Sequence, residues 1–272
     1  MKLAIGTYVR DYSVSGITYD ADALAYFTAN TAITSTADKN AINTFYLGLK
    51  SNGIYTKIKA MYLPLWSSAS ANKWNLINPV DTDAAFRLTF STGWTHSSSG
   101  MTPNGTSAFA DTFITPSTNL TLNSMHLSYY SRTNANTASN EIGSWEGNGF
   151  HYTMMSLRQS NNSNRSSSFI QCTSGSASFI DSDSLGFYIG TRTASNSTVI
   201  YKNGTNSNSI TNTSTGQSTR KIYIGVANGN SFNYSTKQCS FSTIGDGLTS
   251  TEASNLSSRV NTLMTYFGIN TY

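Results

Sequence analysis

The sequence predicts a mainly β protein, an antiparallel β-sandwich or jelly roll with a helical hairpin before it and a helix after it. Between about residues 84 and 245, apolar and polar residues alternate with a period of two, which is typical of half-buried strands. Clusters rich in Gly, Asn and Ser separate these runs and are typical of loops. Many short strands joined by such loops indicate a sandwich.

The amino-terminal part is predicted to contain an arm and a helical hairpin. Residues 1–19 alternate weakly, so we expect a strand or an arm there. Residues 20–66 are expected to form a hairpin packed on the sandwich, with Asp20 capping the first helix and Thr36 the second. Residues 55–61 are predicted to add a further helical turn. The apolar residues of the second helix recur at helical spacing, namely Ile42, Phe45, Tyr46 and Leu49.

Residues 67–272 are predicted to form the sandwich and a closing carboxy-terminal helix. The clearest alternating runs are 86–90, 127–130, 187–190 and 222–226. The last helix is expected to begin with Thr249 or Ser250 as its N-cap, with Glu252 in its first turn. Gly268 is the expected stop.

The composition excludes several classes of protein. Only 11% of the residues are charged and the formal net charge is +4, so the chain lacks the strong positive field of many nucleic-acid-binding proteins. It contains no apolar run of the roughly eighteen residues that a membrane span needs. Ser, Thr and Asn supply 108 of the 272 residues, so hydroxyl and amide groups provide most of the polar surface. We therefore expect no nucleic-acid partner and no insertion into a membrane.

The compartment is indicated by two observations that point in different directions. Arg10 and Asp11 interrupt the short apolar start, so no secretory signal is visible. A surface of Ser, Thr, Asn and Tyr is nevertheless typical of proteins that work outside a cell. Release of a particle by lysis of its host would reconcile the two observations.

Residues 184–256 resemble a known class of β-sandwich. The segment contains two strand motifs and a helix entry in a characteristic order, namely Leu185-Gly186-Phe187-Tyr188-Ile189-Gly190, Arg220-Lys221-Ile222-Tyr223-Ile224-Gly225 and Leu248-Thr249-Ser250-Thr251-Glu252. Together they look like a concanavalin A-like jelly roll of the LamG type. The resemblance implies that fold.

A wider part of the chain is similar to structural proteins of tailed phages of the Bacteroidetes type. Pieces that carry this resemblance include Lys73-Trp74-Asn75-Leu76, Gly93-Trp94-Thr95-His96-Ser97 and Pro103-Asn104-Gly105. The resemblance covers nearly the whole chain. It implies a virion protein of a tail, fibre or capsid appendage, assembled in the host cytoplasm, that contacts other virion proteins and copies of itself. It also implies a host-surface glycan as a candidate ligand.

Two glutamates come close to the catalytic pattern of hydrolases in this superfamily. Those enzymes carry E-x-D-x-E or a bulged E-x-D-x-x-E on one strand, and the nearest match here is Glu141-Ile142-Gly143-Ser144-Trp145-Glu146. Gly143 stands where the middle Asp would be. In an unbulged strand, residues five apart face opposite sides, which separates the carboxylates too far for a retaining mechanism. We therefore expect two surface or loop-edge glutamates, no catalytic residues and a chain that is not an enzyme.

The candidate glycan-binding residues are Tyr130, Arg132, Trp145 and His151. Tyr130 and Arg132 share a strand face with His126. On a concave face, the Tyr130 ring could stack on a sugar, and the Arg132 guanidinium could donate hydrogen bonds to the sugar's hydroxyls or carboxylate. Trp145 and His151 would join them if their strand lies alongside. The alternative is an ordinary solvated or partly packed sheet face.

The candidate metal site is formed by Asp181 and Asp183. LamG-type domains often hold Ca²⁺ at the rim of the sandwich, and two carboxylates with a hydroxyl between them suit this ion. Two carboxylates fall short of the usual six to eight ligands, so a polar turn is the alternative. The three histidines lack metal-ligand spacing, and no other cofactor is expected. For Cys172 and Cys239 the sequence allows either two buried thiols or one disulfide.

Three functions follow from these observations, in this order. The first is a phage virion structural protein with a LamG-like module that contributes to recognition of host-surface glycans. The second is a glycan-binding receptor module that acts as an adhesin. The third is a polysaccharide depolymerase, which would need a convergent pair of carboxylates.

Overall fold

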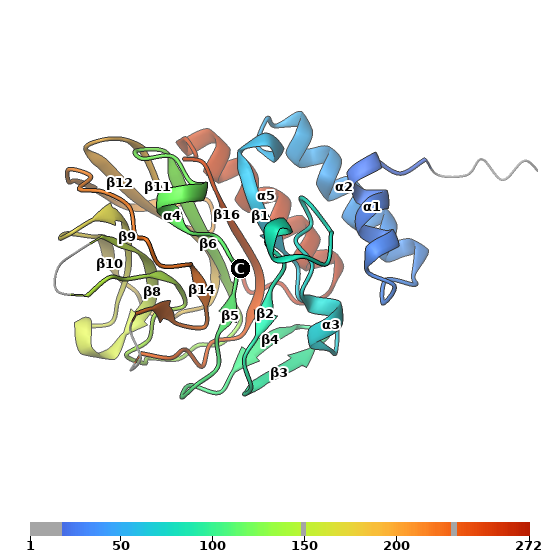
Figure 1. Cartoon of the computed structure of the whole chain (residues 1–272), viewed down its shortest axis with the longest axis horizontal. Coiled ribbons are helices and arrows are strands. Elements are labelled where there is room, and N and C mark those ends of the chain that lie inside the picture. Colours follow the sequence, from blue (N-terminus) through green and yellow to red (C-terminus); the bar gives the residue numbers. More distant parts are fainter. Residues whose placement is uncertain (1–17, 148–150, 230–232) are drawn as a thin grey trace, which may run out of the picture.

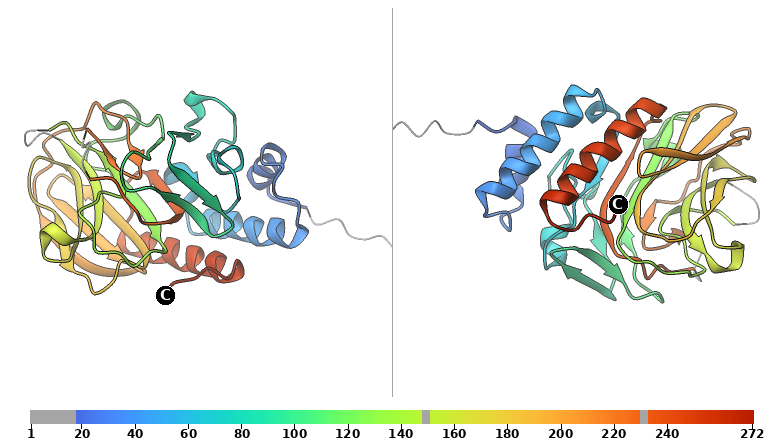
Figure 2. Two further views of the ribbon diagram at one scale, coloured as in Figure 1. Left: turned by 90° about the horizontal axis from the view of Figure 1, so that it is seen from below. Right: turned by 180° about the vertical axis from the view of Figure 1, so that it is seen from behind.

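The computed structural model describes residues 18–147, 151–229 and 233–272, which form two packed β-sheets and a layer of helices (Figure 1). Sheet A lies between sheet B on one side and the long helices on the other (Figure 2). The prediction of a mainly β sandwich with amino-terminal helices and a carboxy-terminal helix is confirmed. The arm expected at residues 1–19 lies almost entirely outside the described residues.

Sheet A has eight strands among the described residues, and β6 and β11 lie near its centre. β6 and β11 pair over seven residues, from Ser131 opposite Gly186 to Met125 opposite Arg192. The strands run in the order β13 (Thr205–Thr211), β12 (Ser197–Lys202), β11 (Gly186–Ala194), β6 (Met125–Ser131), β16 (Cys239–Gly245), β4 (Gly100–Pro103) and β3 (Trp94–Ser97), while β1 (Ile58–Tyr62) also pairs with β16.

Sheet B also has eight strands, several of them only two residues long. All of its pairings are antiparallel except that of β15 (Ala227–Asn228), which runs parallel to β7. The strands run in the order β10 (Ala177–Ile180), β9 (Arg165–Cys172), β8 (Tyr152–Gln159), β7 (Ile142–Ser144), β14 (Tyr223–Ile224), β5 (Ala110–Asp111) and β2 (Thr89–Phe90).

The three long helices begin at side-chain caps. Asp20 accepts a hydrogen bond from the N–H of Asp22 at the start of α1 (Ala21–Ala29), as predicted. The cap of α2 (Thr36–Ser51) is Ser35, one residue before the predicted Thr36. Thr249 forms the predicted capping box with the glutamate at the third position of α5 (Ser250–Tyr266).

The carboxy-terminal helix α5 ends just before Gly268, whose φ of +67° suits glycine. No helix among the described residues is long and apolar enough to cross a membrane. Short helical pieces complete the connections between the longer elements, namely α3 (Ala69–Asn72), α4 (Pro116–Asn119), η1 (Tyr55–Lys57), η2 (Asp83–Ala85) and η3 (Ser160–Asn162).

Sheet A separates two hydrophobic cores. On β6, Leu127 and Tyr129 point into the core between the sheets, whereas Tyr130 points into the core under the helices. Every residue of β6 and β16 is buried. The inter-sheet core includes Ile142, Met155 and Ile170 of sheet B, and the helix-side core includes Phe45, Leu49, Leu256 and Val260 of α2 and α5.

The predicted helical turn at residues 55–61 is wrong. A single 3-10 turn, η1, is followed by strand β1, which pairs with β16. The physical reason is that this segment serves both cores: Ile58 and Met61 pack on the helix side, while Ala60 and Tyr62 pack between the sheets. The segment 20–66 therefore contains one strand of sheet A as well as the hairpin.

The predicted strands at 86–90 and 222–226 are shorter than expected. Phe86 has a left-handed φ of +60° after η2, so the strand is limited to β2. Gly225, with a φ of +94°, follows β14 directly. Cys172 and Cys239 are buried free thiols on different sheets, so of the two alternatives the structure has two thiols.

His126 is a fully buried histidine on β6. Its Nδ1 lies 2.6 Å from the carbonyl oxygen of Asp246, and its Nε2 lies 2.9 Å from Oγ1 of Thr243. Burial lowers the pKa of His126 to about 4, because a charged imidazole would lose its water; the positive charge of Lys57 acts in the same direction. The folded protein therefore keeps this histidine neutral.

We predict that His126 makes the protein less stable in acid. The unfolded chain takes up this proton near pH 6.5 and the folded chain near pH 4, so the contribution is complete above pH 6.5 and is lost as the pH falls toward 4. The loss between pH 7 and pH 5 should be about 2 kcal/mol. Urea unfolding at both pH values should show a smaller acid effect for His126→Gln than for the wild type; equal acid effects would contradict the prediction.

Candidate functional site

Tyr130 and Arg132 serve the packing of the chain end. Tyr130 is fully buried under the helices, and its hydroxyl accepts hydrogen bonds from the backbone N–H and the side chain of Thr271. The guanidinium of Arg132 donates to the carbonyl oxygen of Ile269 at 2.9 Å and to Oε1 of Gln238 at 3.1 Å. The face expected to bind a sugar is therefore covered by the carboxy-terminal residues and the helices.

Trp145 and His151 lie at the end of β7 and the start of β8, in the other sheet. The ring of Trp145 stacks on Tyr152 with 6.0 Å between centroids, and the backbone N–H of Trp145 donates to the carbonyl oxygen of Asn228 at 2.7 Å. His151 is half-buried, close to Gly216. The structure thus brings Trp145 and His151 near each other but does not bring them to Tyr130 and Arg132.

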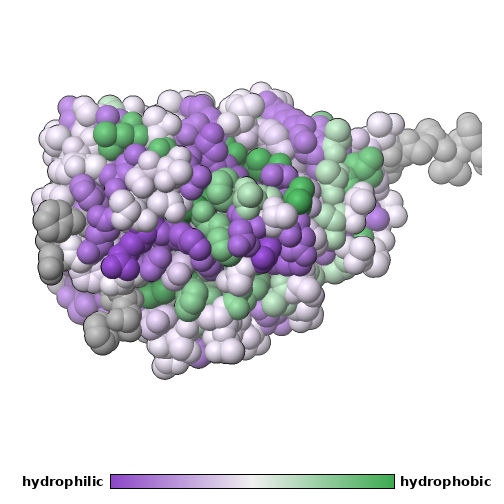
Figure 3. Space-filling model, viewed as in Figure 1, coloured by the Kyte–Doolittle hydropathy of each residue, from purple (hydrophilic) through white to green (hydrophobic). Residues whose placement is uncertain are grey.

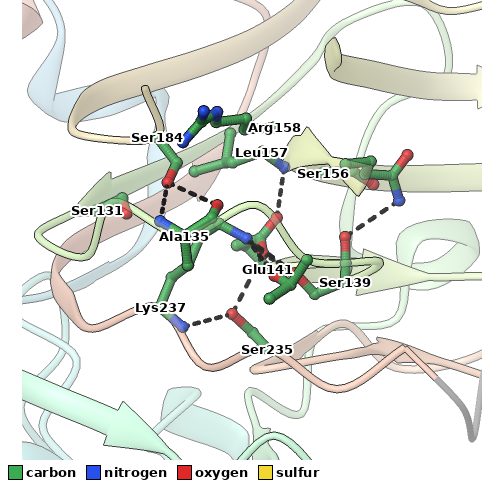
Figure 4. A network of polar contacts seen from close by, with 12 residues as sticks. Ser131, Ala135, Ser139, Glu141, Ser156, Leu157, Arg158, Ser184, Ser235 and Lys237 are labelled. Carbon is green, nitrogen blue, oxygen red and sulfur yellow. Dashed lines mark hydrogen bonds and ion pairs between the residues drawn. The ribbon is translucent and has the colours of Figure 1, made fainter. Parts of the chain in front are cut away.

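Glu141 lies at a loop edge just before β7, as one of the two predicted alternatives has it, but it is buried rather than on the surface and forms an ion pair. Glu141 and Lys237 are both 0% exposed, with 3.1 Å between Nζ and Oε1. Ser139 and Ser235 donate to the same oxygen, and the N–H of Leu157 donates to the other. Figure 4 shows these groups converging from the segment before β7, from β8 and from the segment before β16. Every charge of the pair is matched, so removal of either partner would leave the other charge uncompensated in the interior.

Glu146 lies near the surface, as predicted, and is held by Thr219. Its Oε1 accepts hydrogen bonds from the backbone N–H and the hydroxyl of Thr219. Partial burial alone would raise the pKa of Glu146, but these hydrogen bonds and the charges of His151 and Arg220 lower it below its usual value. The carboxylate is therefore ionised at neutral pH.

Asp181 and Asp183, the candidate calcium ligands, hold the ammonium group of a lysine. Nζ of Lys202 lies 2.7 Å from Oδ1 of Asp181 and 3.0 Å from Oδ1 of Asp183. Oδ2 of Asp181 accepts hydrogen bonds from Ser166 and Tyr188. The ammonium group supplies the positive charge that these carboxylates need, so the pair forms an ion-paired turn. No group of three or more potential metal ligands occurs among the described residues.

An open cavity of about 320 Å³ lies on sheet B beside Trp145. We call it the Phe109–Tyr223 cavity after its two stacked rings, whose centroids are 4.6 Å apart with an interplanar angle of 10°. Figure 3 shows hydrophilic and hydrophobic residues side by side on the face seen in Figure 1. Residues that line the cavity include Phe109, Arg220, Tyr223, Asn228, Gly229 and Tyr234.

Strand pairing positions these side chains. Tyr223 on β14 lies opposite Asp111 of β5 and Gly143 of β7. Its neighbours Ile222 and Ile224 point into the inter-sheet core, so the tyrosine points away from that core. Burial, together with the charge of Asp111, raises the pKa of Tyr223, which keeps its hydroxyl protonated.

Backbone geometry closes the cavity on the side of β15. Nδ2 of Asn228 donates to the carbonyl oxygen of Lys221 at 3.0 Å, which fixes its amide. Gly229 has a φ of +101°, and a Cβ there would lie 1.9 Å from the carbonyl oxygen of Trp145. Glycine is therefore required where β15 meets the end of β7. The cavity combines aromatic rings with fixed polar groups, an arrangement that can bind an amphipathic ligand.

A second cavity, of about 210 Å³, lies between α2 and α5 and is mostly apolar. Its walls include Phe45, Leu263 and Tyr266. The guanidinium of Arg259 at its edge donates to Oδ1 of Asn52 at 3.0 Å. This cavity offers few polar groups to a ligand, so it suits an apolar side chain better than a hydroxyl-rich molecule.

Sequence reasoning missed most residues of the Phe109–Tyr223 cavity. A signal existed for Tyr223, because it alternates with Ile222 and Ile224 and so faces away from the core. Phe109 and Asn228 carry no comparable pattern. They reach Tyr223 through strand pairings between distant segments, which the sequence does not specify.

Comparison with known proteins shows the fold of the chain. No protein-family model and no curated protein sequence matches it. A Trypanosoma rangeli sialidase in complex with a difluoro-KDN matches at a TM-score of 0.53 and 11% identity, over 80% of this chain and 39% of that chain. The same sialidase with sialic acid gives 0.52 and 11%, over 79% and 38%. A domain of a Geobacillus stearothermophilus arabinanase with arabinotriose gives 0.44 and 15%, over 74% and 98%.

These matches correct one prediction. The chain was expected not to be an enzyme, and that expectation does not stand, because the chain shares its fold with part of the sialidase chains. The chain spans about two fifths of the length of those sialidases. The expected jelly-roll class of sandwich agrees with these neighbours.

We predict that Glu141→Gln destabilises the fold strongly. The variant leaves the ammonium of Lys237 fully buried without a counter-charge, and losing one partner of such a pair costs about 3–5 kcal/mol. Glu146→Gln is the control. Its carboxylate lies near the surface, so its loss should lower the free energy of unfolding by about 1 kcal/mol or less. Urea unfolding at pH 7 measures both variants. Equal stabilities for the two would show that the buried pair does not support the fold.

Proposed function

We propose that the chain is a carbohydrate-binding β-sandwich module. The observation that carries this proposal is the Phe109–Tyr223 cavity, where stacked rings meet a guanidinium and an amide. Sugars present C–H faces that pack on aromatic rings, and hydroxyls that bond to polar groups at their edges. The cavity supplies both kinds of contact in one open hollow.

The size and openness of the cavity suit a short segment of a glycan. Its volume of about 320 Å³ lies at the lower end of ordinary ligand sites, so it would hold a sugar residue or two and leave the rest of the chain in solvent. Tyr234 adds a third aromatic residue to the wall.

The fold comparison supports the same ligand class. The sialidase structures with similar folds were solved with sialic acid or a related fluorinated sugar bound. A shared fold does not locate a site, so the proposal rests on the cavity of this chain.

We predict that Tyr223→Ala weakens glycan binding at least about tenfold, because it removes half of the stacked pair. Tyr223→Phe keeps the ring and should retain most of the affinity. Tyr266→Ala, on an exposed tyrosine of α5, is the control for loss of any surface aromatic residue. A glycan array followed by calorimetry on the best ligand measures binding, and reducing-end release in the same samples measures hydrolysis. Equal affinities for Tyr223→Ala and wild type would contradict the assignment.

We further propose that this module is displayed on a phage particle, next to other virion proteins and further copies of itself. The support is the sequence resemblance carried by segments such as Lys73-Trp74-Asn75-Leu76. Mass spectrometry of purified particles should detect the chain, and gold-labelled antibodies should place it on a tail, fibre or capsid appendage. Its absence from purified particles would contradict this part of the proposal.

A further inference from the structure

The charges around the Phe109–Tyr223 cavity are unevenly paired. Lys221 forms an ion pair with Asp111, with 2.9 Å between Nζ and Oδ2. Arg220 is exposed at the cavity and forms no ion pair with any residue that the structure describes. One cation of the site is thus neutralised within the protein, and the other remains available to a ligand.

Glu146 is the acidic group whose charge interacts with Arg220, but it is engaged elsewhere. Its Oε1 takes two hydrogen bonds from Thr219, one from the backbone and one from the hydroxyl. These bonds hold the carboxylate against Thr219, in the irregular segment before Arg220, rather than against the guanidinium. Glu146 therefore lowers the positive potential around Arg220 but does not form an ion pair with its guanidinium.

The stem of Arg220 is positioned at the cavity rim. Its backbone N–H donates to Oγ of Ser218 at 3.1 Å, and Ser218 is itself buried. Its Cδ packs 3.1 Å from the position that a Cβ would take on Gly229. A larger residue than glycine would push the arginine away, so the close approach of the two segments directs its guanidinium to the cavity.

We propose that the Phe109–Tyr223 cavity binds an acidic glycan, with Arg220 pairing with a sugar carboxylate while a sugar ring packs on the aromatic wall. This inference rests on the proposed carbohydrate-binding function and adds the charge of the ligand. A guanidinium offers parallel N–H donors that match the planar geometry of a carboxylate, which makes such pairs strong and selective. The partial exposure of the site makes the pair sensitive to salt.

The test uses matched glycans that differ in charge. Wild-type protein is titrated with 3′-sialyllactose, a hyaluronan oligosaccharide and an oligogalacturonate, each compared with its methyl ester; a sulfated oligosaccharide and neutral lactose complete the panel. We expect at least one carboxylated glycan to bind 10- to 100-fold more tightly than its ester, and more weakly as salt is raised. In Arg220→Gln, the affinity for the acid should fall to that for the ester, whereas binding of the ester should stay unchanged.

Lys59→Gln is the matched control. Lys59 is exposed on β1 of the other sheet, so its variant loses the same net charge without touching the cavity and should bind like the wild type. Acid and ester binding with equal affinity, unchanged binding by Arg220→Gln, or binding of the sulfated glycan alone would overturn the inference. Binding of neutral glycans that depends on Tyr223 but not on Arg220 would overturn it while leaving the proposed function intact. Binding of no glycan would overturn both.

Discussion

The architecture depends on the burial of both faces of sheet A. On β6 and β16 every residue is buried, so the strands need a core on each side. Sheet B covers one face, and α2 and α5 cover the other (Figure 2). Leaving the helix side uncovered would expose Tyr130, Phe187 and Phe241 together, at a cost of about 1.5–3 kcal/mol for each large side chain. The Phe109–Tyr223 cavity lies on the outer face of sheet B, on the side away from the inter-sheet core.

A chain with few charges places several of them inside. Glu141 pairs with Lys237, and Asp181 pairs with Lys202. Arg192 is fully buried and donates to the carbonyl oxygens of Ile170, of Ala194 at the end of β11, and of two residues in nearby loops. Each of these groups links segments far apart in sequence, so an incorrect strand arrangement would leave a charge unpaired in the interior, which costs several kcal/mol. These charges therefore specify which segments meet, and the Ser- and Thr-rich strands alone would specify this poorly.

The same arrangement explains why some aromatic residues serve packing while others lie where a ligand could reach them. Aromatic residues on the inner faces serve packing, as Tyr130 does, whereas Phe109, Tyr223 and Trp145 lie on or beside the outer side of sheet B. β14 joins β5 to β7 there, and the turn at Gly229 brings Arg220 to the same place. A rigid sheet carries the rings while short connecting segments supply the polar groups, which is a common division of roles in binding sites.

The sequence by itself determined the class of fold and the helix ends, because both follow from local patterns. Alternation marks β6 and β11, Asp20 and Thr249 mark helix starts, and these features do not depend on distant contacts. Tertiary structure decided the rest. Alternation shows that β6 has two faces but cannot show that helices cover one of them, and it cannot pair β14 with β5 and β7. The Phe109–Tyr223 cavity arises from those long-range pairings, so only the folded chain brings its residues together.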